Sequence, residues 1–170
     1  MTNNHPFWQF IQTIPNFPKD GIDFYDITPL LYGHVDALID ELLKALPNEL
    51  MNSVECFAAT EARGFVIGSL LSGRTGKSLI LIRKQGKLPP PLFSESYGLE
   101  YGNDTLEIKA DLPASKVLLV DDVLATGGTL KASKTLCQKA GHEVLGALVL
   151  LDLTALHDDI GMPVYRVMHN

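Results

Sequence analysis

Apolar residues recur along the chain with two spacings, one typical of amphipathic helices and one typical of buried strands. Helical spacing predicts four helices, the first two of which end at prolines. These helices are expected at residues 7–14, 35–46, 64–71 and 129–140. Short apolar runs lie between them and predict strands. The strands are expected at residues 54–59, 78–83, 116–120 and 143–151, with a short edge strand at 164–167.

Strands that are almost continuously apolar, with helices between them, indicate a parallel sheet covered on both faces. We therefore predict a single α/β domain over residues 1–170, with three layers and a mostly parallel, twisted sheet flanked by helices. In such sheets ligands bind beyond the carboxyl ends of the strands. The polar loops that follow the first three strands are therefore expected to meet at one edge.

Residues 84–104 have no clean hydrophobic period and include three consecutive prolines. Long segments without secondary structure are uncommon in compact domains and are often lids over active sites. We therefore predict a long loop here, with little local structure over residues 88–104.

Composition and charge narrow the classes of partner. The formal net charge is −6, so the protein as a whole is not expected to bind nucleic acid, and an anionic ligand needs a local basic site. No apolar run is long enough to span a bilayer, and the first residues lack signal-peptide features, which predicts a cytoplasmic protein without a membrane partner. Cys56 and Cys137 lie far apart in apolar segments and are predicted to be buried free thiols.

The stretch "KVLLVDDVLATGGTL" (116–130) carries the most specific chemistry in the sequence. Its small residues stand at the start of a predicted helix, where the first backbone N–H groups lack partners and point outward. Glycines allow a close approach of backbone to ligand, and the hydroxyls add donors. Together these groups predict a cradle for a phosphate monoester. The cradle residues are Ala125, Thr126, Gly127, Gly128 and Thr129.

Asp121 and Asp122 precede this cradle directly. Carboxylates repel a phosphate, but they accept hydrogen bonds from the vicinal hydroxyls of a sugar and bind hydrated Mg²⁺. A pair of acids at a strand end can also serve only to cap and solvate it. The order of acids, small-residue loop and helix favours a site for ribose 5-phosphate.

"VLLVDDVLATGGTL" resembles the signature of the type I phosphoribosyltransferases, which bind phosphoribosyl diphosphate (PRPP). Three other stretches, at residues 16–31, 60–65 and 82–102, resemble the adenine phosphoribosyltransferases in order and spacing. The similarity covers roughly residues 5–152. It implies the type I phosphoribosyltransferase fold and a Mg²⁺-dependent enzyme of purine salvage that converts adenine and PRPP to AMP and pyrophosphate. It also implies a homodimer.

The resemblance assigns cations to the pyrophosphate of PRPP. Arg63 follows the first strand, and Gly64 beside it would let the backbone approach the ligand. Arg83, Lys84 and Lys87 follow the second strand, in a loop that the family uses for pyrophosphate.

The same resemblance makes residues 84–104 a mobile catalytic lid that carries Glu100 and Tyr101 in the "LEYG" motif. Closure would exclude water from an oxocarbenium-like transition state. Glu100 would exchange a proton with the purine as its N9 becomes nucleophilic.

An N-terminal hood, about residues 1–33, is implied to bind the base. The family stacks the purine on the residue at Phe24 and reads its edge with backbone at Asp23, while Val123 and Leu124 contact the other side. Tyr25 stands where many family members have arginine, and Asp23 stands where an aliphatic residue is common. Recognition by backbone groups tolerates both changes, so adenine is the expected base. The two changes bear instead on how strongly adenine is selected over hypoxanthine.

A regulatory module that binds PRPP without catalysis is the alternative. Such regulators carry an added DNA-binding segment or a basic face. This sequence shows neither, and it keeps Glu100 and the basic cluster, which favours the enzyme.

Overall fold

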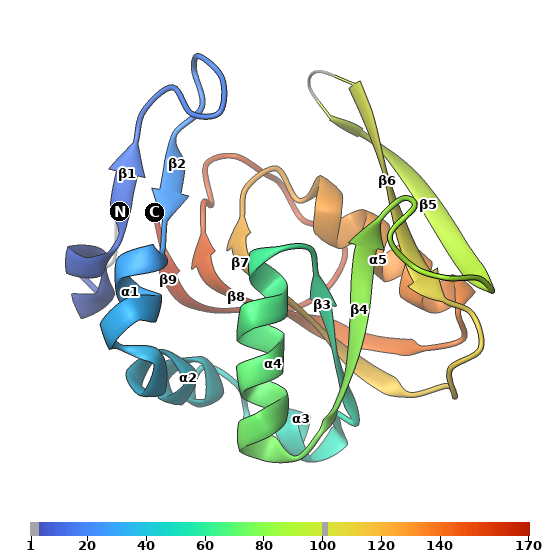
Figure 1. Ribbon diagram of the computed structural model, residues 1–170. Coiled ribbons are helices and arrows are strands. Elements are labelled where there is room, and N and C mark those ends of the chain that lie inside the picture. The colour runs from blue at the N-terminus through green and yellow to red at the C-terminus, as the bar shows by residue number, and fades with distance from the viewer. Residues whose placement is uncertain (1–3, 100–101) are drawn as a thin grey trace.

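The computed structural model describes residues 4–99 and 102–170, and it contains a seven-stranded sheet in the order β5-β6-β4-β3-β7-β8-β9 (Figure 1). Five strands run parallel to their neighbours in the order β4-β3-β7-β8-β9. They are β3 (Cys56–Thr60), β4 (Ser78–Lys84), β7 (Lys116–Leu124), β8 (Glu143–Asp152) and β9 (Val164–His169). The strands β5 (Leu92–Leu99) and β6 (Gly102–Lys109) are antiparallel and extend one edge.

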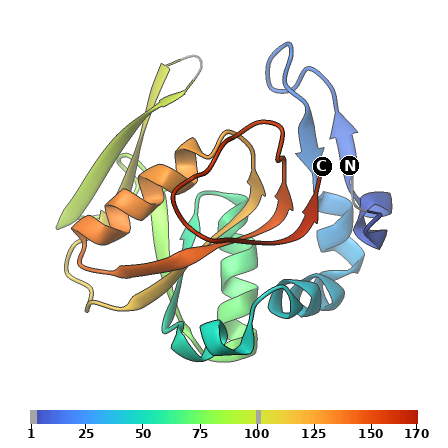
Figure 2. The same ribbon diagram turned by 180° about the vertical axis from the view of Figure 1, so that it is seen from behind.

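Helices cover both faces of this sheet. One face carries α1, α2 and α4 (Figure 1), and the other carries α5 (Figure 2). Their bounds are α1 (Thr28–Gly33), α2 (Val35–Lys44), α4 (Arg63–Thr75) and α5 (Gly128–Lys139), with a short α3 (Asn48–Ser53) before β3. This arrangement confirms the predicted three-layer α/β fold. Within the described ranges, no helix is both long and apolar enough to cross a membrane.

Alternating side chains of the central strands build two separate cores. Phe57 and Ala59 of β3 pack in the core on the α2 and α4 side, whereas Ala58 lies in the core on the α5 side. Each large apolar side chain buried in this way contributes roughly 1.5–3 kcal/mol by removal from water. Cys56 and Cys137 are buried free thiols, as predicted, and burial raises their pKa values to about 11 and about 12.

The N-terminal segment differs from the single helix predicted at residues 7–14. A short 3-10 helix η1 (Pro6–Phe10) is followed by strand β1 (Gln12–Ile14), which pairs antiparallel with β2 (Phe24–Asp26). The helical prediction was wrong because the backbone after Phe10 finds its hydrogen-bond partners in a strand that follows it in sequence. The helices α1 and α3 were not predicted, since helices of six residues each are too short to show a clear period.

The predicted long loop is also wrong in its local structure. Most of it forms a β-hairpin, in which β5 pairs with β6 from Leu92↔Lys109 to Leu99↔Gly102. The hairpin joins the sheet through β6, which pairs with β4 at Arg83↔Glu107. An edge hairpin is exposed along much of its length, so few of its positions need to be apolar and the strand period is weak.

Candidate active site

The carboxyl ends of β3, β4, β7 and β8 lie at one edge of the sheet, and the β1–β2 and β5–β6 hairpins stand on either side of that edge (Figure 1). Two ion pairs join the three predicted loops there. Arg63, after β3, contacts Asp122 of β7, and Arg83 of β4 contacts Glu61 after β3. The structure therefore brings the three loops together, as the parallel topology predicts.

A pocket at this edge is lined by Asp121 and residues 123–130, which include the whole predicted phosphate cradle. Gly127 is the N-cap of α5 and has a φ of 80°. A Cβ atom at this position would lie 2.6 Å from Cγ2 of Ile160. Glycine is thus required both by the backbone conformation and by the close contact with the β8–β9 loop. No side chain caps α5, so its first N–H groups face the pocket as donors.

Tyr97 of the hairpin lies against the same cradle. Its hydroxyl is 3.3 Å from Oγ1 of Thr129, and its ring would be 3.3 Å from a Cβ atom at Gly128. Neither Tyr97 nor Ile160 was predicted as a site residue, although Tyr97 lies inside the stretch at residues 82–102, because both reach the cradle from elements that are distant in sequence.

The two acids occupy the last part of β7. Asp122 is 5% exposed, and Asp121 is half-buried. Burial raises the pKa of both carboxyls, and the negative charge of Asp122 raises that of Asp121 further. The Arg63 guanidinium opposes the rise at Asp122. Two close carboxylates with raised pKa values suit a ligand that brings hydroxyl donors or a cation.

Arg63 links the acids to the hood. Its Nε atom lies 2.8 Å from Oδ2 of Asp122, and its NH1 group donates to the carbonyl oxygen of Tyr25 at 2.8 Å. The guanidinium also lies 4.5 Å from the ring centroid of Phe24. The Nε–H direction does not meet hydrogen-bond geometry, so Oδ2 of Asp122 is buried with an ion-pair partner but without a hydrogen bond among the described residues.

Gly64 allows α4 to begin directly against the sheet. A Cβ atom there would lie 2.8 Å from both Oγ1 of Thr60 and the carbonyl oxygen of Val120, and 3.2 Å from Oδ1 of Asp121. Any larger residue would push the helix, and Arg63 with it, away from the acids.

The hood is an aromatic cluster on the β1–β2 hairpin. Phe24 packs edge-to-face against Phe17 at 5.1 Å between centroids, and Tyr25 meets Trp8 at 6.3 Å. Asp23 before them is exposed. The predicted contacts from β7 lie on opposite faces: Val123 packs with the core that Tyr25 joins, whereas Leu124 is buried in the core on the α5 side. Only Val123 therefore faces the hood side of the sheet.

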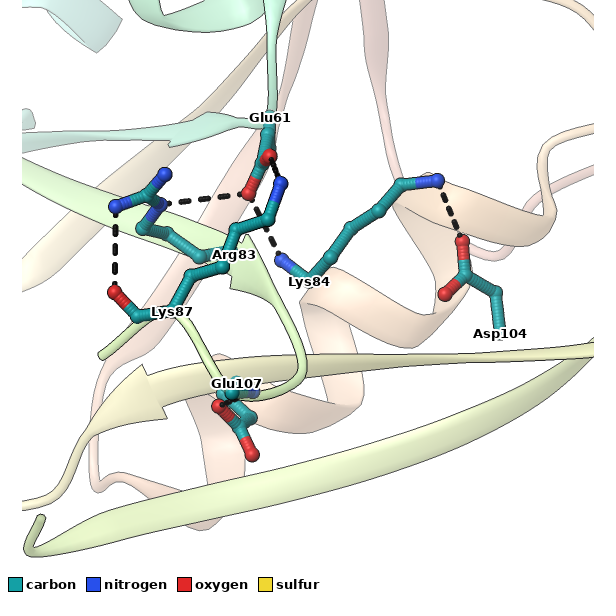
Figure 3. Close-up of polar contacts among 7 residues, drawn as sticks. Glu61, Arg83, Lys84, Lys87, Asp104 and Glu107 are labelled. Atoms are coloured by element: carbon teal, nitrogen blue, oxygen red, sulfur yellow. Dashed lines mark hydrogen bonds and ion pairs between the residues drawn. The ribbon is translucent and has the colours of Figure 1, made fainter. Parts of the chain in front are cut away.

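The three predicted pyrophosphate cations that follow the second predicted strand are each paired with a carboxylate (Figure 3). Arg83 and Lys87 contact Glu61, and Nζ of Lys84 lies 2.9 Å from Oδ2 of Asp104. Glu61 was not predicted as a site residue, although it lies inside the "TEARGF" stretch. Glu100 and Tyr101 lie outside the described residues.

Comparison with known proteins agrees with this geometry. A model of the phosphoribosyl transferase domain matches residues 26–170. The adenine phosphoribosyltransferase of Hydrogenovibrio crunogenus is 41% identical over 168 residues, which cover 96% of each chain. The structure of the adenine phosphoribosyltransferase of Thermoanaerobacter pseudethanolicus is 40% identical with a TM-score of 0.89, over 96% of this chain and 98% of that one.

A more distant structure is the adenine phosphoribosyltransferase of Saccharomyces cerevisiae, complexed with an imino-altritol bisphosphate and adenine. It is 31% identical with a TM-score of 0.86, over 95% of this chain and 96% of that one. The likeness in sequence and structure extends over nearly the whole chain. The chain therefore belongs to the phosphoribosyltransferase family and, within it, to the adenine phosphoribosyltransferases.

Proposed function

We propose that this protein transfers the 5-phosphoribosyl group of PRPP to adenine and releases AMP and pyrophosphate. The observation that carries the proposal is the pocket lined by Asp121 and residues 123–130, in which the Asp121 carboxylate adjoins an uncapped helix N-terminus. Acceptors for ribose hydroxyls thus lie beside donors for its 5′-phosphate. The 5′-phosphate binds Ala125, Thr126, Gly127, Gly128 and Thr129, and the ribose binds Asp121 and Asp122.

The base lies between the hood and β7. Phe24 offers an aromatic face, and the guanidinium of Arg63 holds that ring in place from 4.5 Å. The backbone at Asp23 and Tyr25 reads the purine edge, and Val123 gives apolar contact from the sheet. The adenine complex of the Saccharomyces cerevisiae relative supports adenine as the base. Leu124 acts indirectly, because it is buried beneath the cradle beside Gly127.

The pyrophosphate lies toward β4, where Arg83, Lys84 and Lys87 supply positive charge. Arg63 and the backbone at Gly64 approach it from the start of α4. In this role Arg63 exchanges part of its contact with Asp122 for the ligand, which its exposed third of side-chain surface permits.

The residues present fit a Mg²⁺ ion that is held mainly by the substrate. Asp121 and Asp122 are hard oxygen ligands, but Mg²⁺ prefers six, so two carboxylates suit contact through bound water. No group of three or more His, Cys, Asp or Glu residues within 4–99 and 102–170 is placed to hold a metal alone. When bound, Mg²⁺ neutralises charge on the pyrophosphate leaving group.

Proton transfer is assigned to the hairpin. Glu100, supported by Tyr101, takes up the proton that the purine loses when the N9–ribose bond forms. The β5–β6 hairpin, with residues 84–104 as its moving part, excludes water from the reacting carbon.

The proposed unit is one domain of 170 residues, in which about residues 1–33 form the hood. It acts in the cytoplasm as a homodimer.

The test is PRPP-dependent formation of AMP from adenine by the purified protein in the presence of Mg²⁺, with hypoxanthine and guanine as competing bases. We expect AMP to form and the other bases to compete weakly. Absence of AMP formation, or equal use of hypoxanthine, would contradict the proposal. Light scattering on the same sample measures the oligomeric state.

A further inference from the structure

Glu61 joins two of the predicted pyrophosphate cations in the ligand-free protein. Its carboxylate pairs with Nε of Arg83 at 3.3 Å and with Nζ of Lys87, and it accepts the backbone N–H of Lys84 at 3.1 Å (Figure 3). The Glu61 side chain is only 10% exposed. One largely covered carboxylate therefore contacts three groups of residues 83–87, the basic turn.

Glu61 remains ionised in this position. Burial alone would raise the pKa of its carboxyl. The hydrogen bonds from Lys87 and from the Lys84 backbone, together with the positive charges nearby, lower the pKa by more than burial raises it, so the net change is downward. The negative charge thus stays beside Arg83 and Lys87 at neutral pH. It occupies the electrostatic role that an anionic ligand would otherwise fill.

The contact that holds the backbone of the turn does not involve the charged groups of its side chains. Glu107 is 6% exposed and accepts the N–H of Gly86 at 2.9 Å. The side chain of Lys87, by contrast, is 46% exposed, so its ammonium group can exchange partners without movement of the backbone. Lys84 has a similar arrangement with Asp104.

We propose that Glu61 is an internal counter-anion, which holds Arg83 and Lys87 in the free enzyme and competes with pyrophosphate for them. This inference rests on the function proposed above. A pyrophosphate carries several negative charges and displaces the single carboxylate when it binds. Glu61 pairs with Arg83 and Lys87 again when pyrophosphate dissociates. This competition weakens the binding of pyrophosphate and speeds its release.

The proposal makes Glu61 a positioning residue that acts through Arg83 and Lys87. Glu61→Gln removes its charge and keeps an oxygen that can accept the Lys84 N–H, so the turn stays in place. Loss of one nearby negative charge should tighten the binding of magnesium pyrophosphate by about 10-fold. A residue that only braces the turn would give equal or weaker binding when replaced.

Glu107→Gln is the matched control. It removes one negative charge that lies on β6 against the same turn and retains an acceptor for Gly86, but Glu107 makes no ion pair with Arg83 or Lys87 among the described contacts. Its effect on pyrophosphate binding should be smaller than that of Glu61→Gln, because the Glu107 carboxylate does not compete with pyrophosphate by direct pairing with either cation.

The experiment is titration calorimetry of magnesium pyrophosphate into the wild-type protein and both variants, combined with steady-state product inhibition. Tighter binding and a lower inhibition constant in Glu61→Gln alone, with an unchanged KM for adenine, support the proposal. Equal or weaker binding in Glu61→Gln, or equal tightening in both variants, overturns it.

The same measurements separate this inference from the proposed function. A wild-type protein that binds adenine but not magnesium pyrophosphate would overturn the pyrophosphate site and the role of Glu61 with it. Intact pyrophosphate binding without AMP formation would contradict only the proposed reaction.

Discussion

Arg63 contacts Asp122 and the carbonyl oxygen of Tyr25 at the same time, each at 2.8 Å. This side chain therefore joins the acid pair on β7 to β2 in the proposed base-binding hood. The link connects the regions proposed to hold the two substrates, and it depends on Gly64, which lets α4 start flush against the sheet.

Replacement of Arg63 by Ala should destabilise the protein by roughly 1–3 kcal/mol, because the buried Asp122 carboxylate loses its charged partner. The free energy of unfolding in urea measures this effect. The double variant Arg63→Ala/Asp122→Asn should recover part of the loss. A double variant that is as unstable as the sum of the two single variants would show that the residues do not interact.

Gly127→Ala should abolish most PRPP and AMP binding. The new Cβ atom would lie 2.6 Å from Ile160, and the φ of 80° is strained for any other residue. Gly141→Ala is the control, since Gly141 has a φ of 85° but open space around its Cβ position. Both variants carry the backbone cost of about 1–2 kcal/mol. Fluorescence or calorimetric titration with AMP should separate them, and equal AMP affinities would place the phosphate elsewhere.

Tyr97→Phe should raise the KM for PRPP by about 2–10-fold, the effect of one lost hydrogen bond, because the Thr129 hydroxyl loses its partner. The KM for adenine should change little. Tyr32→Phe provides the comparison, as Tyr32 is 94% exposed and does not line the cradle pocket. If Tyr97→Phe leaves both constants unchanged, the hydroxyl contact has no role in binding.

Glu100→Gln should lower kcat by roughly 10²–10⁴ while the affinity for adenine and PRPP changes much less. The amide keeps the shape of the side chain but does not accept a proton as a carboxylate does. Single-turnover kinetics isolates the chemical step from product release. Wild-type turnover in that assay would leave the hairpin with only a water-excluding role.

His157 should make stability depend on pH. Burial lowers the pKa of its imidazole, but the hydrogen bond to Asp152 at 2.7 Å and the contact with the Asp158 carbonyl outweigh this and raise it. A raised pKa in the folded state gives stabilisation that is complete below the ordinary value of 6.5 and is lost as pH rises through the folded value. The arrangement also includes Arg166, which pairs with Asp152, and Lys131, whose charge opposes the rise.

Urea denaturation of the wild type and His157→Gln at pH 6 and pH 8.5 checks this expectation. The wild type should exceed the variant in free energy of unfolding by more at pH 6 than at pH 8.5. A difference that is independent of pH would mean that the ionised imidazole does not contribute.

The sequence by itself determined the parallel core and the centre of the candidate site. Apolar runs such as residues 116–120 are local signals, and a strand that is buried on both faces must be apolar throughout. Asp121, Asp122 and residues 125–129 also lie within one short segment, so the link from acids to helix N-terminus could be predicted without knowledge of the fold.

The tertiary structure alone decided which distant groups complete that site. The β1 strand and the β5–β6 hairpin are stabilised by pairing between strands. Because these segments are short or exposed, their own hydrophobic periodicity does not indicate that pairing. Tyr97, Ile160 and Glu61 reach the cradle or the basic turn from separate elements. Such contacts depend on register and on backbone approach over a few ångströms, and a linear pattern of residue types contains neither.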